Sequence, residues 1–527
     1  MNADNYRANR KEKLKNINFS PVSHTNKDMK ENLKTLHFTE KLQLLRKNVA
    51  TDADITIREF KIGQTDVNVA IVYVNGLIDK ELINENVLKS LMVNFFEVYK
   101  FEISLATSDE IKMFLKNYVL TIGSLKECDI VDEMYTELLT GYTVLLIDGM
   151  KGVLLLETKL WKVRGIEEPI TENLVRGPRI GFTESLGDNM SLLRRQSGKA
   201  HVTIDQFSVG NRTKKNVVIA YFKDIANDEL VNEVRNRICS INIDDVAESG
   251  YIEQLIEDNY LSPFPQIQST ERPDRVMGAL LEGRVSILLD GTPFALIVPT
   301  GFSMLLQSPE DYYERWIPAS LLRSLRYMAA FISLFLPAIY ISFVSFHQGL
   351  IPTKLVMSMA GTRMGVPFPS FIEALLMEVS IEILREAGLR LPKPVGQTVG
   401  LVGGLVVGEA AVQANIVSPI MVIVVALTAI SSFVIPQYGA SVALRMLRFV
   451  TMFFAAILGL YGVILFVLLL TTHLIKLKSF NMLYVTPAVP YRFSDLKDFI
   501  VRMPLRFMKV RPKMLHPKDS IRKRDKR

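Results

Sequence analysis

A single carboxylate, Glu409, lies within a long uncharged stretch of this chain. The 51 residues between Lys393 and Arg445 contain no other charged side chain. Because one helical crossing of a bilayer needs roughly 20 apolar residues, this stretch is long enough for two crossings. A carboxylate at the centre of a membrane helix costs roughly 2.5–3.5 kcal/mol on insertion scales, which predicts a partner, a wet cavity or an ion path beside it. Gln413 lies one helical turn later and continues a polar strip on the same face.

Small residues repeat every four positions just before this carboxylate. The repeat consists of Gly396, Gly400, Gly404 and Gly408. A small-xxx-small tract allows another helix to approach closely, so it predicts tight packing in a multi-helix membrane assembly. Three interpretations of Glu409 stay open: a pore or gate position, a structural hydrogen bond to a neighbouring helix, and a proton-coupling site.

A second group of acids recurs at helical spacing in residues 369–390. Glu378, Glu382 and Glu386 stand four residues apart, and Arg385 is the cation beside them in the sequence. Like charges at this spacing repel, so the segment predicts an amphipathic helix at the interface or along a wet vestibule. In a ring of identical subunits each acid would become a ring of acids, which favours cations. The alternative is a surface helix with a solvated acidic face.

The elements that would position these residues form a membrane domain at 311–480. Four predominantly apolar segments predict transmembrane spans near 327–346, 395–416, 418–436 and 449–475. Before them, Tyr312, Tyr313 and Trp316 are expected at the level of the lipid headgroups. Four crossings would return the chain to its starting side, whereas a fifth crossing at 369–390 would reverse the C-terminal tail.

The residues before the membrane domain carry an α/β pattern that occurs twice, at 51–165 and 206–310. The run NVAIVY at 68–73 matches NVVIAY at 216–221. Later in each copy, LL-x-G is followed by an apolar run and Asp-Gly, a dipeptide that predicts a hairpin turn. The predicted fold is therefore two similar cytosolic α/β subdomains, a bundle of about four transmembrane helices and an amphipathic helix.

The two copies are joined by residues 166–205, which are dense in charge, glycine and proline. A compact basic motif in this segment consists of Arg176, Gly177, Pro178 and Arg179. The motif could hold an anion or the carboxylates of a partner. In the alternative, it belongs to a linker whose arginines pair with acids of the same segment, which are Glu167, Glu168, Glu172 and Glu184.

Composition narrows the class of protein. Residues 1–50 carry 11 Lys and Arg against 5 Asp and Glu, and residues 491–527 carry 13 against 4. Basic tails at 1–50 and 481–527 suit contact with anionic lipid, and no aromatic platform or zinc spacing favours nucleic acid. The two cysteines fit a reducing compartment, and the N-terminal segment has no apolar core typical of a secretory signal. We find no nucleotide motif, metal cluster or nucleophile constellation, so we expect no cofactor, no metal and no enzymatic activity.

Four long segments resemble the A subunits of the GerA family of spore germinant receptors. They are RGPRIGFTESLGDN at 176–189, LLEGRVSILLDGTPFALIVP at 280–299, PFPSFIEALLMEVSIEILREAGLRLP at 367–392 and VGGLVVGEAAVQANIVSPIMVIVVALTAISSFVIP at 402–436. The resemblance extends over about residues 55–490. It implies a protein of the spore inner membrane that acts with a transporter-like B subunit and a lipoprotein C subunit. It also implies an A subunit that oligomerises into a nutrient-gated cation channel.

The leading hypothesis is thus a homo-oligomeric, nutrient-gated ion channel subunit, with 395–416 and the acidic helix lining the conduit. A secondary transporter and a non-conducting scaffold that holds partner subunits through its soluble domains are the alternatives. Stage V sporulation protein AF, a close relative with the same fold, is the other identity that the resemblance allows. The nutrient sensed is not encoded in any motif that we recognise.

Overall fold

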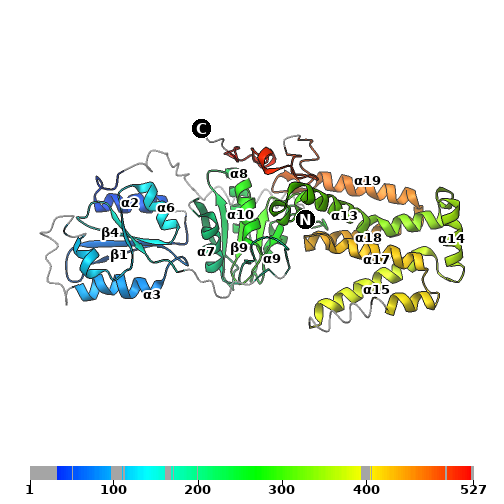
Figure 1. Cartoon of the computed structure of the whole chain (residues 1–527), viewed down its shortest axis with the longest axis horizontal. Coiled ribbons are helices and arrows are strands. Elements are labelled where there is room, and N and C mark those ends of the chain that lie inside the picture. Colours follow the sequence, from blue (N-terminus) through cyan, green and yellow to red (C-terminus); the bar gives the residue numbers. More distant parts are fainter. Residues whose placement is uncertain are drawn as a thin grey trace. The chain divides into compact units, whose positions relative to one another are not determined.

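The computed structural model describes residues 32–49, 52–95, 110, 113–160, 168–169, 171–198, 200–392, 404, 406–492 and 495–523. The chain forms two compact units (Figure 1). The first is built mainly from residues 54–161, and the second runs from 201 to the C-terminus together with the connecting segment before it.

The first unit contains one antiparallel five-stranded sheet in the order β1-β2-β4-β5-β3. Its strands are β1 (Ile55–Lys61), β2 (Asn68–Val74), β3 (Leu125–Cys128), β4 (Tyr142–Ile147) and β5 (Val153–Glu157). Its helical elements are α2 (Phe38–Val49), α3 (Lys80–Ile83), η3 (Asn84–Leu88), η4 (Ser90–Asn94), η6 (Leu115–Val119) and α6 (Val131–Leu139). Alternate residues of β2 face opposite sides, so Val69 joins the core under α3 while Ala70 joins the core under α2 and α6.

The second unit begins with a sheet of the same topology, in the order β6-β7-β9-β10-β8. Its strands are β6 (Val202–Val209), β7 (Lys215–Phe222), β8 (Gln268–Thr270), β9 (Val285–Leu289) and β10 (Ala295–Val298). One face is covered by α8 (Asp228–Cys239) and α9 (Ser249–Ile256), and the other by α7 (Leu186–Ser197) and α10 (Pro273–Glu282). The predicted repeat therefore corresponds to equivalent strands, β2 with β7 and β4 with β9.

Both predicted hairpins are confirmed. The Asp148-Gly149 turn joins the antiparallel strands β4 and β5, and the Asp290-Gly291 turn joins β9 and β10. The two glycines have φ of +80° and +90°, a region in which a Cβ would be strained.

The predicted boundary of the connecting segment at 205 is wrong. Helix α7 and the first residues of β6 belong to the second α/β subdomain, because Leu192, Leu193 and Val202 are buried in its core. Two arginines follow these leucines directly, so the sequence pattern does not show the apolar face of α7.

The remainder of the second unit is helical. Short elements at its start are α11 (Phe302–Leu305) and α12 (Glu310–Tyr313). The longer helices are α13 (Trp316–Ser345), α15 (Ser370–Arg390), residues 406–413, α17 (Pro419–Phe433), α18 (Tyr438–Leu458) and α19 (Leu460–Lys476). The elements η7 (Gln348–Leu350) and α14 (Thr353–Arg363) lie between α13 and α15.

Contacts between helix ends show the course of the chain. We call the end that touches the second α/β subdomain the base, where Gln437 donates to the Ser269 carbonyl. We call the other end the tip, where Ser345 and Ser370 are hydrogen-bonded. Glu373 accepts from the Ser418 amide at the tip, and Arg385 donates to Ser432 near the base. Helices α13 and α18 therefore run from base to tip, and helices α15, α17 and α19 run from tip to base.

The predicted fourth span at 449–475 is wrong as a single helix. Helix α18 ends at Leu458, Gly459 has φ of +57°, and α19 begins at Leu460. A Cβ at Gly462 would lie 2.1 Å from the carbonyl oxygen of Phe454, so the two helices pack closely as a hairpin. A continuous apolar run does not reveal such a turn, except through the glycine itself.

The predicted C-terminal tail is also a folded segment over most of its length. It contains β12 (Met482–Leu483), which pairs with β11 (Lys478–Ser479) just before it, and also η8 (Leu505–Phe507) and η9 (Lys513–Leu515). Tyr484 and Arg502 are buried, and Arg511 donates to the Leu281 carbonyl on the second α/β subdomain. Some of its basic side chains therefore make contacts within the folded protein.

Candidate functional site in the helical region

A network of ion pairs joins α15 to α18 inside the helical region. Glu378 and Arg448 lie 3.1 Å apart, and both side chains are fully buried. Glu382 is 2.7 Å from Arg445, 3.1 Å from Arg448 and 3.2 Å from Arg385. Because buried charges are stable only when they are paired, the network fixes the register of the two helices.

Helix α17 is tied to the same network. Arg385 donates to the Ser432 hydroxyl at 3.0 Å, and its guanidinium lies 4.6 Å from the ring centroid of Phe433. One charged cluster therefore connects α15, α17 and α18.

The network holds three guanidinium groups against two carboxylates. Four of its guanidinium nitrogens are buried without a hydrogen-bond partner among the residues that the structure describes: Arg385 Nε, Arg445 Nε, Arg448 Nε and Arg448 Nη1. Excess positive charge and free donors in a low-dielectric interior make the cluster sensitive to any change in its carboxylates.

The predicted acids thus occupy different environments. Glu378 and Glu382 face α18 and pair with arginines more than 60 residues away in the sequence. Glu386 is exposed and pairs with Arg390 on the same helix at 2.6 Å. The sequence signal for the partners is the pair Arg445 and Arg448, which interrupts an apolar helix at helical spacing.

Glu409 lies on an exposed face of residues 406–413. The Gln413 side chain donates to its Oε1 at 3.0 Å, so the predicted polar strip is present. Glu373 pairs with Arg363, and the other acids in the described part of 327–476 pair with arginines as given above. Glu409 is therefore the one carboxylate in that part without a cation within 4 Å.

The glycine tract is described only in part. Gly404 has nothing within 4 Å of an added Cβ, and a Cβ at Gly408 would lie 3.7 Å from Val422 on α17. Gly396 and Gly400 lie outside the described residues. The predicted close packing therefore has its contact at Gly408.

The basic motif of the connecting segment lies beside the start of the helical region. Arg176 is 3.7 Å from Glu314, and Arg179 is 3.9 Å from Glu168; both arginines are exposed. A Cβ at Gly177, with φ of +150°, would lie 2.9 Å from the Tyr313 ring, and the Pro178 carbonyl accepts from Arg272. Both arginines thus pair within the chain, and one of them pairs with an acid of its own segment.

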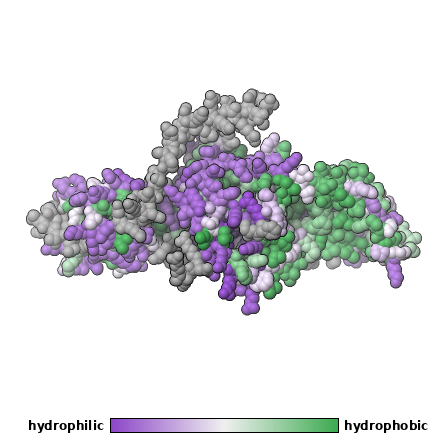
Figure 2. Space-filling model, turned by 90° about the horizontal axis from the view of Figure 1, so that it is seen from above, coloured by the Kyte–Doolittle hydropathy of each residue, from purple (hydrophilic) through white to green (hydrophobic). Residues whose placement is uncertain are grey.

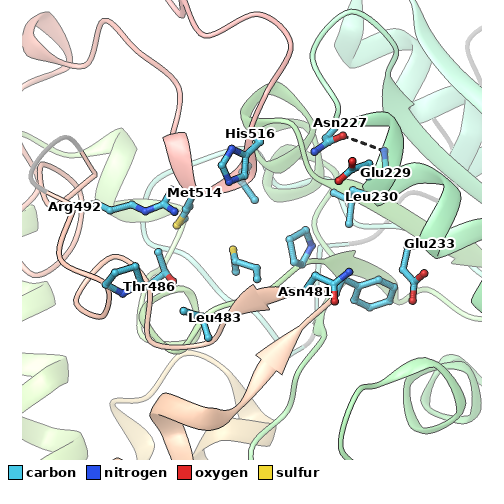
Figure 3. Close-up of a pocket in the computed structure, with 15 residues that line it drawn as sticks. Asn227, Glu229, Leu230, Glu233, Asn481, Leu483, Thr486, Arg492, Met514 and His516 are labelled. Carbon is cyan, nitrogen blue, oxygen red and sulfur yellow. Dashed lines mark hydrogen bonds between the residues drawn. The ribbon is translucent and has the colours of Figure 1, made fainter.

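A cavity that the sequence did not reveal lies between the second α/β subdomain and the C-terminal segment. Its volume is ≈ 230 Å³. Figure 3 shows Glu229 and Glu233 of α8 on one side and Arg492 across from them, with Leu483 and Met514 between. Acidic and basic groups face each other there across apolar side chains.

The fold and the site define the class of protein: a duplicated α/β module joined to an apolar helical region with a buried charged network. Two of its helices, Trp316–Ser345 and Tyr438–Leu458, are long and apolar enough to cross a membrane, and Pro419–Phe433 and Leu460–Lys476 are shorter apolar helices. Figure 2 shows hydrophobic residues gathered over this region.

Comparison with known proteins gives the family. Residues 43–514 match the model described as Bacillus/Clostridium GerA spore germination protein. The chain is 45% identical to spore germination protein B1 of Bacillus subtilis (strain 168) over 92% of its length and 98% of the relative's. It is 50% identical to spore germination protein A1 of the same organism over 70% of its length and 77% of the relative's. The chain belongs to the GerA family of spore germination proteins.

The chain has two further similarities to known proteins. It is 43% identical to a Bacillus subtilis protein named uncharacterized membrane protein YfkQ, over 92% of the chain and 91% of the relative. It is also similar to the crystal structure of the N-terminal domain of the A subunit of the Bacillus megaterium spore germinant receptor GerK3. That match has 36% identity and a TM-score of 0.40, and it covers 52% of this chain and 98% of the other.

Proposed function

We propose that this chain is the A-type subunit of a germinant receptor, that its helical region spans the spore inner membrane, and that copies of it form a cation channel opened by a nutrient. The observation that carries the membrane part is the orientation of α15. Its charged Glu373 and Glu378 are fully buried, whereas Ile383 and Leu389 are 64% and 65% exposed. A helix in water has the opposite arrangement, while lipid favours charges inside and apolar side chains outside.

The topology follows from the alternating helices. Five of the described helices run between base and tip, and the described residues 406–413 add a helical segment beside α17, so we assign six crossings in place of the four predicted spans. An even number of crossings keeps the α/β subdomains and the C-terminal segment on one side, which we assign to the spore core.

The channel part rests on Glu409. Glu378 and Glu382 are paired within the protomer, so we assign them a bracing role rather than a place on the conduit. Glu409 and Gln413 are exposed, and Gly404, before them in the chain, has nothing within 4 Å of an added Cβ. An unpaired carboxylate on a conduit attracts cations, and symmetric copies would repeat it around the axis.

The proposed partners follow from family membership. Several of the relatives are named spore germination proteins. We place this chain in a receptor with a transporter-like B subunit and a lipoprotein C subunit. The nutrient would act through that complex.

The test compares Glu409→Gln with Glu386→Gln in the complete receptor. Glu386 is also an exposed acid of the helical region, but it has Arg390 as a partner. We expect Glu409→Gln to lower the cation-to-anion permeability ratio of nutrient-evoked currents in planar bilayers, and Glu386→Gln to leave the ratio unchanged. Unaltered selectivity in Glu409→Gln, with channels still opening, would remove Glu409 from the conduit.

The current record itself separates the rival functions. Discrete single-channel steps support a pore. Currents that saturate with solute at a turnover-limited rate would instead favour a transporter, and no current with normal germination would favour a scaffold.

A further inference from the structure

Exposed apolar side chains gather at one loop of the second α/β subdomain. Tyr260 and Leu261 are 79% and 77% exposed, more than any other large apolar side chain in the described residues 200–300. They lie four and five residues after the end of α9, in the segment Asn259–Pro265, which we call the base loop.

The base loop has a fixed conformation. The buried Gln266 side chain accepts from the amides of Asp258 and Asn259 and donates to the Asn259 carbonyl. The Asn259 side chain accepts from the Leu261 amide. The two apolar residues are therefore presented on a rigid turn, and binding a surface costs little conformational entropy.

The base loop is attached to the helical region. Ser262 is hydrogen-bonded to His473 of α19 at 2.9 Å, and Phe264 is buried in the core of the helices. A Cβ at Gly439, at the start of α18, would lie 3.4 Å from Pro265. The loop thus contacts the ends of two helices.

The contact with His473 shows the level along α19 at which the base loop lies. His473 lies three residues before Lys476, the last residue of α19, which places it about 4.5 Å further towards the tip. The exposed Leu468, Leu469 and Ile475 continue the apolar surface of α19 down to this level. Tyr438 and Trp316, also exposed, begin α18 and α13 at the base. Aromatic side chains at this level are typical of a membrane interface.

We propose that the base loop inserts Tyr260 and Leu261 into the lipid headgroup layer, so that the second α/β subdomain has its own membrane contact beside α19. This inference rests on the membrane embedding proposed above. We take lipid as the occupant because the loop is hydrogen-bonded to α19 at the end where exposed apolar side chains of that helix, such as Ile475, reach the base.

The orientation of α9 supplies control positions that lie at greater distances from the proposed membrane surface. The side chain of Glu248, before α9, accepts from Thr292 in the β9–β10 turn, at the end of the sheet away from the helices. Tyr251 on α9, which is 51% exposed, therefore lies further from the membrane than Leu261. Lys214, exposed in the β6–β7 turn, lies at that same remote end.

The experiment uses the full chain reconstituted in phosphatidylcholine vesicles whose acyl chains carry bromine at shallow or deep positions. Trp161 and Trp316 are replaced by phenylalanine, and one tryptophan is introduced at a time. Leu261→Trp should lose fluorescence to shallow bromines, and Leu468→Trp in α19 to deep ones. Tyr251→Trp should be quenched less than Leu261→Trp, and Lys214→Trp not at all.

The two proposals fail in different ways. If Leu468→Trp is quenched and Leu261→Trp is not, the helices are in lipid and the base loop inference is overturned, whether a second copy or water covers the loop. If Leu468→Trp is not quenched either, the membrane embedding and the inference are both overturned.

Discussion

Replacing Arg448 with methionine should destabilise the protein strongly, because it removes the one described cation that pairs with Glu378. The distance between the two groups is 3.1 Å and neither side chain is exposed. Removing one partner of a buried ion pair costs about 3–5 kcal/mol, since the other charge stays buried without compensation. Glu382 retains Arg445 at 2.7 Å and Arg385 at 3.2 Å, so the loss concentrates on Glu378.

The double-mutant cycle makes this reasoning specific. Glu378→Gln leaves Arg448 with Glu382 at 3.1 Å, so we expect a smaller loss of about 1–3 kcal/mol. In the double variant no unpaired charge remains at position 378. We therefore expect it to be more stable than Arg448→Met alone, with a coupling energy of about 1–3 kcal/mol.

The matched control is Arg390→Gln. Its pair with Glu386 is shorter, at 2.6 Å, but the two side chains are 78% and 60% exposed. An exposed pair contributes about 0–1 kcal/mol. The free energy of unfolding would be measured for each full-length variant in mild detergent by titration with dodecyl sulfate. Equal losses for Arg448→Met and Arg390→Gln, or strictly additive losses in the cycle, would refute the buried network.

Two further predictions concern a hairpin and a pH dependence. Gly459→Ala places a Cβ 3.0 Å from Phe346 in a residue with φ of +57°, so the same titration should show a loss of about 1–3 kcal/mol; an unchanged midpoint would contradict the α18–α19 turn. Burial of Glu253, together with the neighbouring Glu257 and Glu248, raises the pKa of its carboxyl group to about 7. Between about pH 4.5 and about pH 7 the folded state therefore keeps a proton that the unfolded state releases. The free energy of unfolding falls as pH rises from about 4.5 to about 7. Glu253→Gln should match the parent at pH 4 and exceed its stability at pH 8 by up to about 3 kcal/mol, and equal stability at both pH values would contradict the burial of this acid.

The α/β part was accessible to sequence reasoning because its signals are local. The strand pattern of NVAIVY and the turn preference of Asp-Gly act within a few residues, and the duplication supplied each signal twice. Helix α7 was missed because its apolar stripe is short and interrupted by charge. Its burial depends on contacts with β6 and α10 that no local pattern contains.

For the charged site, the sequence predicted the acidic residues but not the arginines that pair with them. The spacing of Glu378 and Glu382 located the acids, but their neutralisation by Arg445 and Arg448 depends on how α15 packs against α18. The sequence showed a repelling acidic face, whereas the fold shows a paired one. Long-range pairing of this kind leaves no periodic signal in a single sequence.

This pairing also explains why the helices were undercounted. A span count treats each charge as exposed to lipid, and by that criterion the acids of α15 excluded it from the membrane. Because Glu378 and Glu382 reach guanidinium groups inside the bundle, the helix can present Ile383 and Leu389 outward instead. The division of 449–475 at Gly459 adds one more segment by a different cause. In the topology proposed above, two added segments keep the number of crossings even, so the C-terminal segment is assigned to the same side with six helices as with four.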